Sequence, residues 1–294
     1  MVAVDGADLP LWTAGAHLNI VVAPEFLRQY SMCGDPSDRS CYEIAVLLES
    51  EGRGGSKLMQ RIFERGRRLF VSKPINHFAL EPSASLSLLF GAGIGVTPMI
   101  AFAHELDSVG RNFKLRYSVS TQASAAFDSD LDAQPWAKKC SKHYSDQGSR
   151  LNITAVVPSY EAGIHIYVCG PNVYMNAILD HARFMGYPDE VLHAELFAVP
   201  DMPDWINFPF EIECRNGQKV AVSVDQSASD ALIAAGISVD VKCSDGLCGV
   251  CRCTLISGEV EHRDFVLSAR QREHTMILCQ SRALQKNAVL KLGI

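Results

Sequence analysis

The sequence predicts a multidomain protein in which an antiparallel β-barrel is followed by a doubly wound α/β domain and then a small α+β domain. Its 294 residues exceed what one hydrophobic core usually organises, so two or three domains are expected. Short alternating segments fill residues 1–81, and strands alternate with helices over residues 82–202. A proline-bearing break at residues 200–204 marks the second boundary, and a hairpin, a helix and a cysteine-rich loop follow in residues 206–294.

Composition and charge narrow the class of protein. Hydrophobic residues make up 48% of the chain and charged residues 20%, which is typical of a folded globular protein. The net charge of -6 and the lack of a basic footprint argue against nucleic-acid binding. The sequence has neither the long apolar run of a membrane span nor the basic-then-apolar order of a signal peptide. We therefore expect a cytoplasmic monomer whose ten cysteines are reduced thiols.

The first segment has the pattern of a small barrel. Polar and apolar residues alternate at 17–22, 28–33 and 42–48, and several short strands at such close spacing predict an antiparallel barrel. A glycine-rich loop at 52–56 leads into a helical pattern at 57–63. Free N–H groups at the start of that helix would suit a phosphate, although a plain helix entry is the commoner meaning of such a loop.

The middle segment begins like a parallel nucleotide-binding unit. An apolar run at 85–90 leads into a glycine turn and then a helix at 100–106. The turn is not the dinucleotide fingerprint G-x-G-x-x-G, because Thr97 and Pro98 stand where the last glycine would be. Further strands are expected at 113–119, 151–156 and 165–168, and a further helix at 174–179.

Two glycine turns fall where parallel strands should end, which is where doubly wound sheets bind their ligands. One is formed by residues 91–98 and the other by residues 169–171, whose cysteine could also be a plain buried turn residue. A basic residue after the second strand usually meets a 2′-phosphate. Residues 118–122 contain none, which favours NADH over NADPH, although Arg116 or Arg150 could reach the site.

The last segment predicts an iron–sulfur domain. An Asn-Gly turn within 215–218 joins two alternating strands, and a helix at 229–236 follows. Four cysteines then have the plant-type spacing of 2Fe-2S ligands, whereas zinc sites favour two separated pairs. A fifth, Cys253, is expected on the following strand as packing. The predicted ligands are Cys243, Cys248, Cys251 and Cys279. A hairpin, a helix and this loop have the order of a β-grasp ferredoxin.

Two short motifs in the first segment resemble the flavin signature of the ferredoxin-NADP reductase superfamily. They are an Arg-x-Tyr-Ser sequence and a later Gly-Gly-Ser sequence, formed by Arg28, Tyr30, Ser31, Gly54, Gly55 and Ser56. The resemblance implies that Arg28 meets the flavin phosphate, Tyr30 packs on the isoalloxazine ring and Ser31 lies near the flavin N5. The residue types suit these roles, since Arg offers a planar fork for phosphate and Tyr an apolar face.

The middle segment is similar to the same superfamily. The superfamily's Gly-x-Gly-x-Thr-Pro turn under the pyridine nucleotide corresponds to Gly93, Gly95, Thr97 and Pro98. Cys169, Gly170 and Pro171 resemble its second nicotinamide contact, with the cysteine near the hydride-transfer site. Glu195 and Phe197 resemble the segment that returns toward the flavin, with Phe197 as an aromatic cover or, alternatively, a core residue. The resemblance thus implies that hydride transfer involves Ser31, Cys169, Glu195 and Phe197.

The order of the three segments resembles the phthalate dioxygenase reductase type, the class IA reductases of Rieske oxygenases. The resemblance implies FMN, NADH and a 2Fe-2S cluster, with electrons passed to a Rieske-type terminal oxygenase in aromatic catabolism. In this family a further strand usually precedes the sequence that begins at Val2, so we expect the chain to start inside the barrel. The alternatives are an FAD-dependent reductase of another multicomponent hydroxylase, a non-enzymatic electron carrier, or a zinc-bound interaction module.

Overall fold

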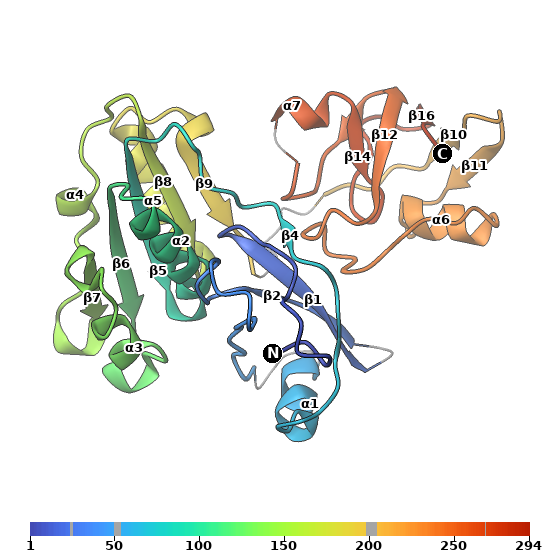
Figure 1. The fold of residues 1–294 in the computed structure, drawn as a ribbon. Coiled ribbons are helices and arrows are strands. Elements are labelled where there is room, and N and C mark those ends of the chain that lie inside the picture. Colours follow the sequence, from blue (N-terminus) through green and yellow to red (C-terminus); the bar gives the residue numbers. More distant parts are fainter. Residues whose placement is uncertain (24–25, 50–53, 198–204, 268) are drawn as a thin grey trace. The chain divides into compact units, whose positions relative to one another are not determined.

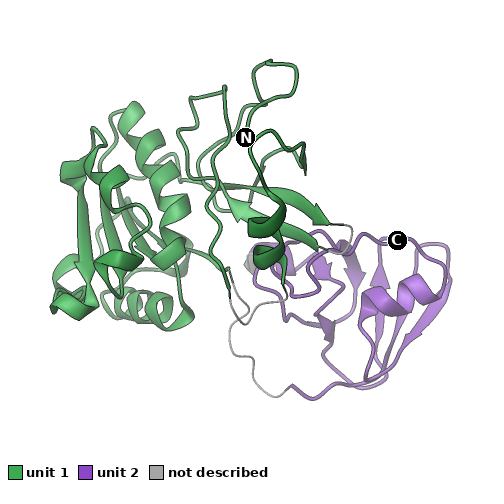
Figure 2. Ribbon diagram, turned by 90° about the horizontal axis from the view of Figure 1, so that it is seen from below, with its two compact units in different colours: residues 1–197 green, residues 198–294 purple. Residues whose placement is uncertain are grey.

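The structure is a computed structural model of the chain, which splits into two compact units, Met1–Phe197 and Ala198–Ile294 (Figures 1 and 2). The first unit contains the segment predicted at 1–81 and, up to residue 197, the segment predicted at 82–202. The predicted boundary at 200–204 lies outside the described residues. The residues described are 1–23, 26–49, 54–197, 205–267 and 269–294.

An antiparallel sheet forms the N-terminal part of the first unit. Its central strand is β1 (Ala16–Ala23), which pairs with β2 (Phe26–Ser31), β3 (Phe70–Val71) and β4 (Ile75–Asn76). Residues 16–20 of β1 are buried on both faces and only Val21 is exposed, so the strand is more deeply buried than the alternation of the sequence predicted. Helix α1 (Gly55–Ile62) follows the glycine-rich loop. Among the described residues this pairing does not close on itself, so the barrel stays a prediction.

The strand predicted at 42–48 is wrong. In that segment the structure has only an isolated bridge between Met32 and Ile44. Leu47 is 54% exposed and Leu48 is 49% exposed, so neither face of the segment is buried at its C-terminal end. A period-2 pattern produces a strand only where a partner covers one face.

A five-stranded parallel sheet forms the rest of the first unit (Figure 1). Its order is β7-β6-β5-β8-β9, and every neighbouring pair is parallel. The central strands β5 and β8 are almost wholly buried, as expected for a sheet with helices on both faces. The strands are β5 (Leu86–Ala92), β6 (Phe113–Val119), β7 (Cys140–Tyr144), β8 (Ile164–Cys169) and β9 (Leu192–Glu195).

Helices α2 (Val96–Ser108) and α5 (Asn172–Phe184) follow β5 and β8, as predicted. The strand expected at 151–156 is wrong, because Ile153–Val156 forms the short helix α4. Ile153, Val156 and the buried Val157 have the i, i+3, i+4 spacing of a helical face, which the alternation of the segment does not explain. The remaining helices of this unit are α3 (Asp128–Asp132) and the 3-10 turns Gly93–Gly95, Gln122–Ser124, Ala137–Lys139, Ser145–Gln147 and Asp189–Val191.

The second unit is built on a five-stranded mixed sheet of order β11-β10-β16-β12-β14. The predicted hairpin and helix are confirmed, and Ser227 caps the helix by accepting the Asp230 N–H. The sheet strands are β10 (Phe210–Glu213), β11 (Lys219–Val222), β12 (Arg252–Ser257), β14 (Thr275–Ile277) and β16 (Val289–Leu292). The other elements are the pair β13 (Val260–Glu261) and β15 (Arg282–Ala283), with helices α6 (Ala228–Ala234) and α7 (Ala269–Arg272).

Within the described part of the chain, no helix combines the length and the apolar character needed to cross a membrane.

Candidate functional site

The predicted phosphate loop brings Arg28 to the start of α1. Gly54 precedes the helix at a φ of 88°, in the left-handed region that favours glycine. A Cβ on Gly55 would lie 2.5 Å from Nε of Arg28, so the guanidinium lies against the first turn. Arg28 otherwise donates to the Leu27 carbonyl at 3.0 Å and lies over the Phe26 ring. Residues 52 and 53 of the loop lie outside the described residues.

This environment has the donor set of a phosphate site. The first turn of α1 carries no acidic residue, and its leading N–H groups have no partner within the helix. Ser56 contributes to the shape of the loop, because its hydroxyl accepts the Glu49 N–H at 3.2 Å. Arg28, Gly54, Gly55 and Ser56 therefore fit the flavin phosphate that the resemblance implies.

Ser31, Cys169 and Glu195 lie together, although they are far apart in the sequence. The Ser31 hydroxyl donates to Oε2 of Glu195 at 2.8 Å, and Glu195 is the register partner of Cys169 across β8 and β9. Ser31 is 6% exposed and Cys169 is 0% exposed. Three of the four residues predicted for hydride transfer thus form one cluster.

Burial controls the protonation of this cluster. Part of Glu195 is exposed, but its carboxyl group lies among protein atoms, and burial raises its pKa to about 7 despite the Ser31 hydrogen bond. Burial, and after it the nearby Glu195, raises the pKa of the Cys169 thiol well above its ordinary value. Cys169 therefore stays protonated at neutral pH, which fits close packing and not nucleophilic attack.

Tyr30 and Phe197 differ in environment. Tyr30 is half-buried, and desolvation raises the pKa of its hydroxyl, with Arg28 acting in the opposite direction. It faces the same side of the sheet as Arg28, because the two residues are two positions apart on β2. Phe197 is 41% exposed, so it is not the core residue of the alternative interpretation. Its ring is open to a ligand.

The two glycine turns of the parallel sheet touch each other. A Cβ on Gly95 would lie 2.4 Å from the Cys169 carbonyl oxygen, and one on Gly170 would lie 2.8 Å from Cβ of Ala92. Both turns lie at the C-terminal ends of neighbouring parallel strands, the edge at which such sheets bind nucleotides. The Thr97 hydroxyl donates to the Ile94 carbonyl at 3.0 Å, which tightens the first turn of α2.

Pro98 and Pro171 each begin a helix at this edge. Pro98 lies buried in the first turn of α2. Backbone N–H groups of a first turn have no acceptor within the helix, so the lack of an N–H in proline costs no hydrogen bond there. Pro171 is the N-cap of α5, directly after Gly170 at a φ of 150°. The predicted nucleotide residues therefore lie together in the two turns at this edge of the sheet: Gly93, Gly95, Thr97, Pro98, Cys169, Gly170 and Pro171.

Replacing Gly95 by Ala should destabilise the first unit by about 3 kcal/mol, because neither backbone at the contact with Cys169 can yield easily. Gly93→Ala is the matched control. No atom lies within 4 Å of a Cβ at Gly93, and its φ of 55° costs only about 1 kcal/mol. Urea unfolding of both variants checks the difference, and equal losses would contradict the close approach.

The end of β6 lies at the edge of the sheet where doubly wound folds bind nucleotides. Thr121 forms a capping box with Ser124 there. Asp146 donates its N–H to the Ser120 carbonyl at 3.0 Å, which places an acidic residue beside the strand end. Sequence reasoning missed Asp146, because it follows a strand that the sequence did not predict. Arg116 donates to the Ser141 hydroxyl at 3.3 Å and is thus already engaged within the sheet.

The four predicted cluster cysteines converge in the second unit. The Cys243 sulfur accepts hydrogen bonds from Cys248 and Cys279, which lower its pKa far below the ordinary value. Contact with Cys279 lowers the pKa of Cys251 to about 7. The same contacts raise the pKa values of Cys248 and Cys279, so it is the closeness of the four sulfur atoms that suits a shared iron site.

The loop directs its backbone at these sulfurs. The Asp245 N–H donates to the Cys243 sulfur at 3.3 Å, and Gly246 and Gly249 have φ values of 74° and 66°. Ser244 also has a positive φ, and its carbonyl accepts the Gln280 side-chain N–H at 2.7 Å. Amides aimed at sulfur are what an iron–sulfur loop needs, so the residues present fit the cluster.

Among the residues that the structure describes, no group of three or more His, Cys, Asp or Glu side chains is arranged to hold a metal ion. A 2Fe-2S cluster takes two thiolates at each iron, and its assignment rests on the spacing, the thiol contacts and the comparisons below. Cys253 lies on β12 with its thiol directed at the Thr254 carbonyl, as its predicted packing role requires.

A chain that joins a doubly wound nucleotide fold to a four-cysteine ferredoxin fold is an electron-transfer oxidoreductase. A family model described as a 2Fe-2S iron-sulfur cluster binding domain matches residues 212–284. The chain is 37% identical over 299 residues to the vanillate O-demethylase oxidoreductase of a Pseudomonas species, covering 100% of this chain and 93% of that protein. It is 33% identical over 299 residues to the carnitine monooxygenase reductase subunit of Escherichia coli, covering 99% of this chain and 92% of that protein.

A solved structure agrees with these relatives. That of phthalate dioxygenase reductase, described as modular for electron transfer from pyridine nucleotides to 2Fe-2S, matches with a TM-score of 0.70 and 32% identity. The match covers 100% of this chain and 91% of that protein. The chain belongs to the phthalate dioxygenase reductase family, as its motifs predicted.

Proposed function

We propose that this chain is the reductase component of a Rieske-type oxygenase system, carrying electrons from NADH through FMN and a 2Fe-2S cluster to the oxygenase. The observation that carries the proposal is the coexistence of the Ser31–Cys169–Glu195 cluster in the first unit with the converging thiols in the second. Relatives named for a demethylase, a monooxygenase and a dioxygenase support an oxygenase partner. Two of those names refer to aromatic compounds, which supports a role in aromatic catabolism.

Each residue has a definite task in this proposal. Bound flavin supplies the chemistry that accepts a hydride and releases electrons singly. Arg28 and the N-terminus of α1 would hold its phosphate, Tyr30 would pack on its ring, and Ser31 would lie near its N5 while the Ser31 hydroxyl donates to Glu195. The protonated thiol of Cys169 and the exposed ring of Phe197 exclude water from the reacting faces.

The nucleotide is proposed to be NADH. The acidic Asp146 beside Ser120 suits a ribose 2′-hydroxyl and repels a 2′-phosphate. We also propose residues 1–81, 82–202 and 206–294 as the flavin, nucleotide and ferredoxin segments of a cytoplasmic monomer. The partner oxygenase would bind at Gly249 and Val250 in the cluster loop. Val250 is 37% exposed.

The purified protein should be yellow-brown, release FMN on denaturation, contain iron and inorganic sulfide, and be reduced faster by NADH than by NADPH. Stopped-flow absorbance with each nucleotide and chromatography of the released flavin make the measurement. FAD in place of FMN would favour another multicomponent hydroxylase. Zinc without flavin would favour an interaction module, and faster reduction by NADPH would contradict the assignment of NADH.

A further inference from the structure

Asp264 is a buried carboxylate with no task in the proposed function. The residue is 2% exposed, and burying a carboxylate is costly unless hydrogen bonds and cations compensate it. Its Oδ2 accepts the N–H of Leu267 at 2.9 Å and that of Val266 at 3.3 Å. The Arg272 guanidinium lies 3.8 Å from Oδ2 and donates to the Asp264 carbonyl at 2.7 Å. The carboxylate therefore folds residues 264–267 into a turn, which we call the Asp264 turn.

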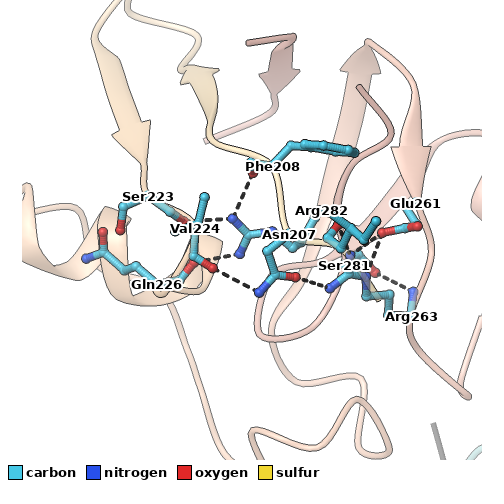
Figure 3. A network of polar contacts seen from close by, with 10 residues as sticks. Asn207, Phe208, Ser223, Val224, Gln226, Glu261, Arg263, Ser281 and Arg282 are labelled. Carbon is cyan, nitrogen blue, oxygen red and sulfur yellow. Dashed lines mark hydrogen bonds and ion pairs between the residues drawn. The ribbon is translucent and has the colours of Figure 1, made fainter. Parts of the chain in front are cut away.

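The other carboxylate oxygen is joined to the segment that presents a cluster ligand. Oδ1 of Asp264 accepts the Ser281 hydroxyl at 3.5 Å, and the same hydroxyl oxygen accepts the Arg263 N–H at 3.3 Å. Ser281 follows Cys279 by two residues. The next residue, Arg282, is 5% exposed and donates to three backbone carbonyls at 2.7–3.0 Å (Figure 3). The Asp264 turn is thus attached to a segment that is itself fixed within the second unit.

The Asp264 turn lies directly on the cysteine loop. The Phe265 N–H donates to the Gly246 carbonyl at 3.2 Å, and a Cβ on Gly246 would lie 3.3 Å from Cα of Asp264. A Cβ on Gly249 would lie 3.3 Å from Cγ2 of Val266. Glycine at both positions allows this close approach. The turn therefore contacts the loop at two points, each of which lies between two predicted cluster ligands.

We propose that Asp264 is a positioning residue that holds the Asp264 turn against the cysteine loop and so slows the loss of the iron–sulfur cluster. The inference rests on the proposed function, because it concerns the same 2Fe-2S site. Leu267 belongs to the same buried core as Cys251 and Cys279, and Val266 packs against that core. The protein around a metal site controls the access of solvent to it. Release of the turn would expose the cysteine loop to water and to chelators.

Asp264→Ala and Asp264→Asn together form the primary test. The Ala variant removes the acceptor of two backbone N–H groups, whereas the amide oxygen of Asn can still accept from Val266 and Leu267. In the full-length protein with excess EDTA, the visible absorbance of the cluster should disappear about 10-fold faster in the Ala variant and within about three-fold of the wild-type rate in the Asn variant. Rescue by Asn would show that the turn, and not the charge, protects the cluster.

Hydrogen exchange supplies a readout that does not depend on electron transfer. The amides of Val266 and Leu267 donate to Asp264, so they should exchange faster with deuterium in Asp264→Ala than in wild type or Asp264→Asn. Mass spectrometry of the peptide that contains residues 264–267 makes the measurement. Unchanged exchange in the Ala variant would overturn the proposal.

Val266→Ala is the second variant, because it shortens the side chain that faces Gly249 and leaves the hydrogen bonds of Asp264 in place. It should lose the cluster several-fold faster than wild type, which tests the proposal even if Asp264→Ala does not fold. Glu273→Ala, at an exposed carboxylate just beyond α7, is the control and should keep the wild-type rate.

The remaining outcomes separate this proposal from the proposed function. A wild-type rate of cluster loss in Val266→Ala, or equal rates in the Ala and Asn variants of Asp264, would overturn the role of the Asp264 turn. A wild-type protein without iron and sulfide would contradict the proposed function. The hydrogen-exchange difference would then still decide whether Asp264 holds the turn.

Discussion

Replacing Cys248 by Ser should abolish electron transfer from NADH to cytochrome c while NADH still reduces the flavin. Cys248 is 4% exposed and its thiol contacts the Cys243 sulfur, so its loss removes one ligand and opens the site. Hydride transfer depends on the other unit, which has its own core and needs no cysteine of the loop. Anaerobic stopped-flow at the flavin band and steady-state reduction of cytochrome c measure the two steps separately.

Cys253→Ser is the matched control for this prediction. Cys253 is also buried, at 9% exposed, and lies two residues beyond Cys251, but its thiol is directed at the Thr254 carbonyl. Its replacement should keep the cluster spectrum and the cytochrome c rate. A Cys248→Ser protein that still reduced cytochrome c at the wild-type rate would remove the cluster from the electron path.

Replacing Ser31 by Ala should slow flavin reduction by NADH about 100-fold, because it removes a preorganised polar group at the reacting centre together with its hydrogen bond to Glu195. The substitution should also raise the pH at which the rate changes. The Ser31 hydrogen bond lowers the pKa of Glu195 against the larger effect of burial, so without it that pKa rises above about 7. Single-turnover rates between pH 5 and 9 make the measurement, and a rate within two-fold of wild type would contradict it.

Glu195→Gln separates this titration from the hydrogen bond itself, because the amide still accepts from Ser31 and does not titrate. The folded pKa of Glu195 is raised from 4.5 to about 7, so its contribution to stability is fully present below pH 4.5 and is lost as pH rises through 7. The free energy of unfolding of the Gln variant minus that of wild type should therefore be larger at pH 8 than at pH 4. Urea unfolding at the two pH values checks the sign.

Local patterns predicted much of the fold. The hairpin at Asn216–Gly217, the helix after Gly54 and the strand–turn–helix around Gly93 all follow from short-range backbone preferences. The two segments wrongly predicted as strands, 42–48 and 151–156, alternate in sequence, but neither pairs along its length with another strand. The edge strand β7 escaped prediction because its residues are all half-buried and show no clear period.

The sequence by itself determined which kinds of ligand this protein is built for. The cysteine spacing, the glycine turns and the Arg-x-Tyr-Ser motif are each contained in a short segment, because each ligand needs a particular backbone conformation over a few residues. Only the tertiary structure decided which distant residues act together. Ser31 and Glu195 are 164 positions apart, and Arg282 and Phe208 are 74 apart. Such hydrogen bonds depend on how sheets and loops fold back on one another, and they leave no periodic signal in the chain that the sequence could reveal.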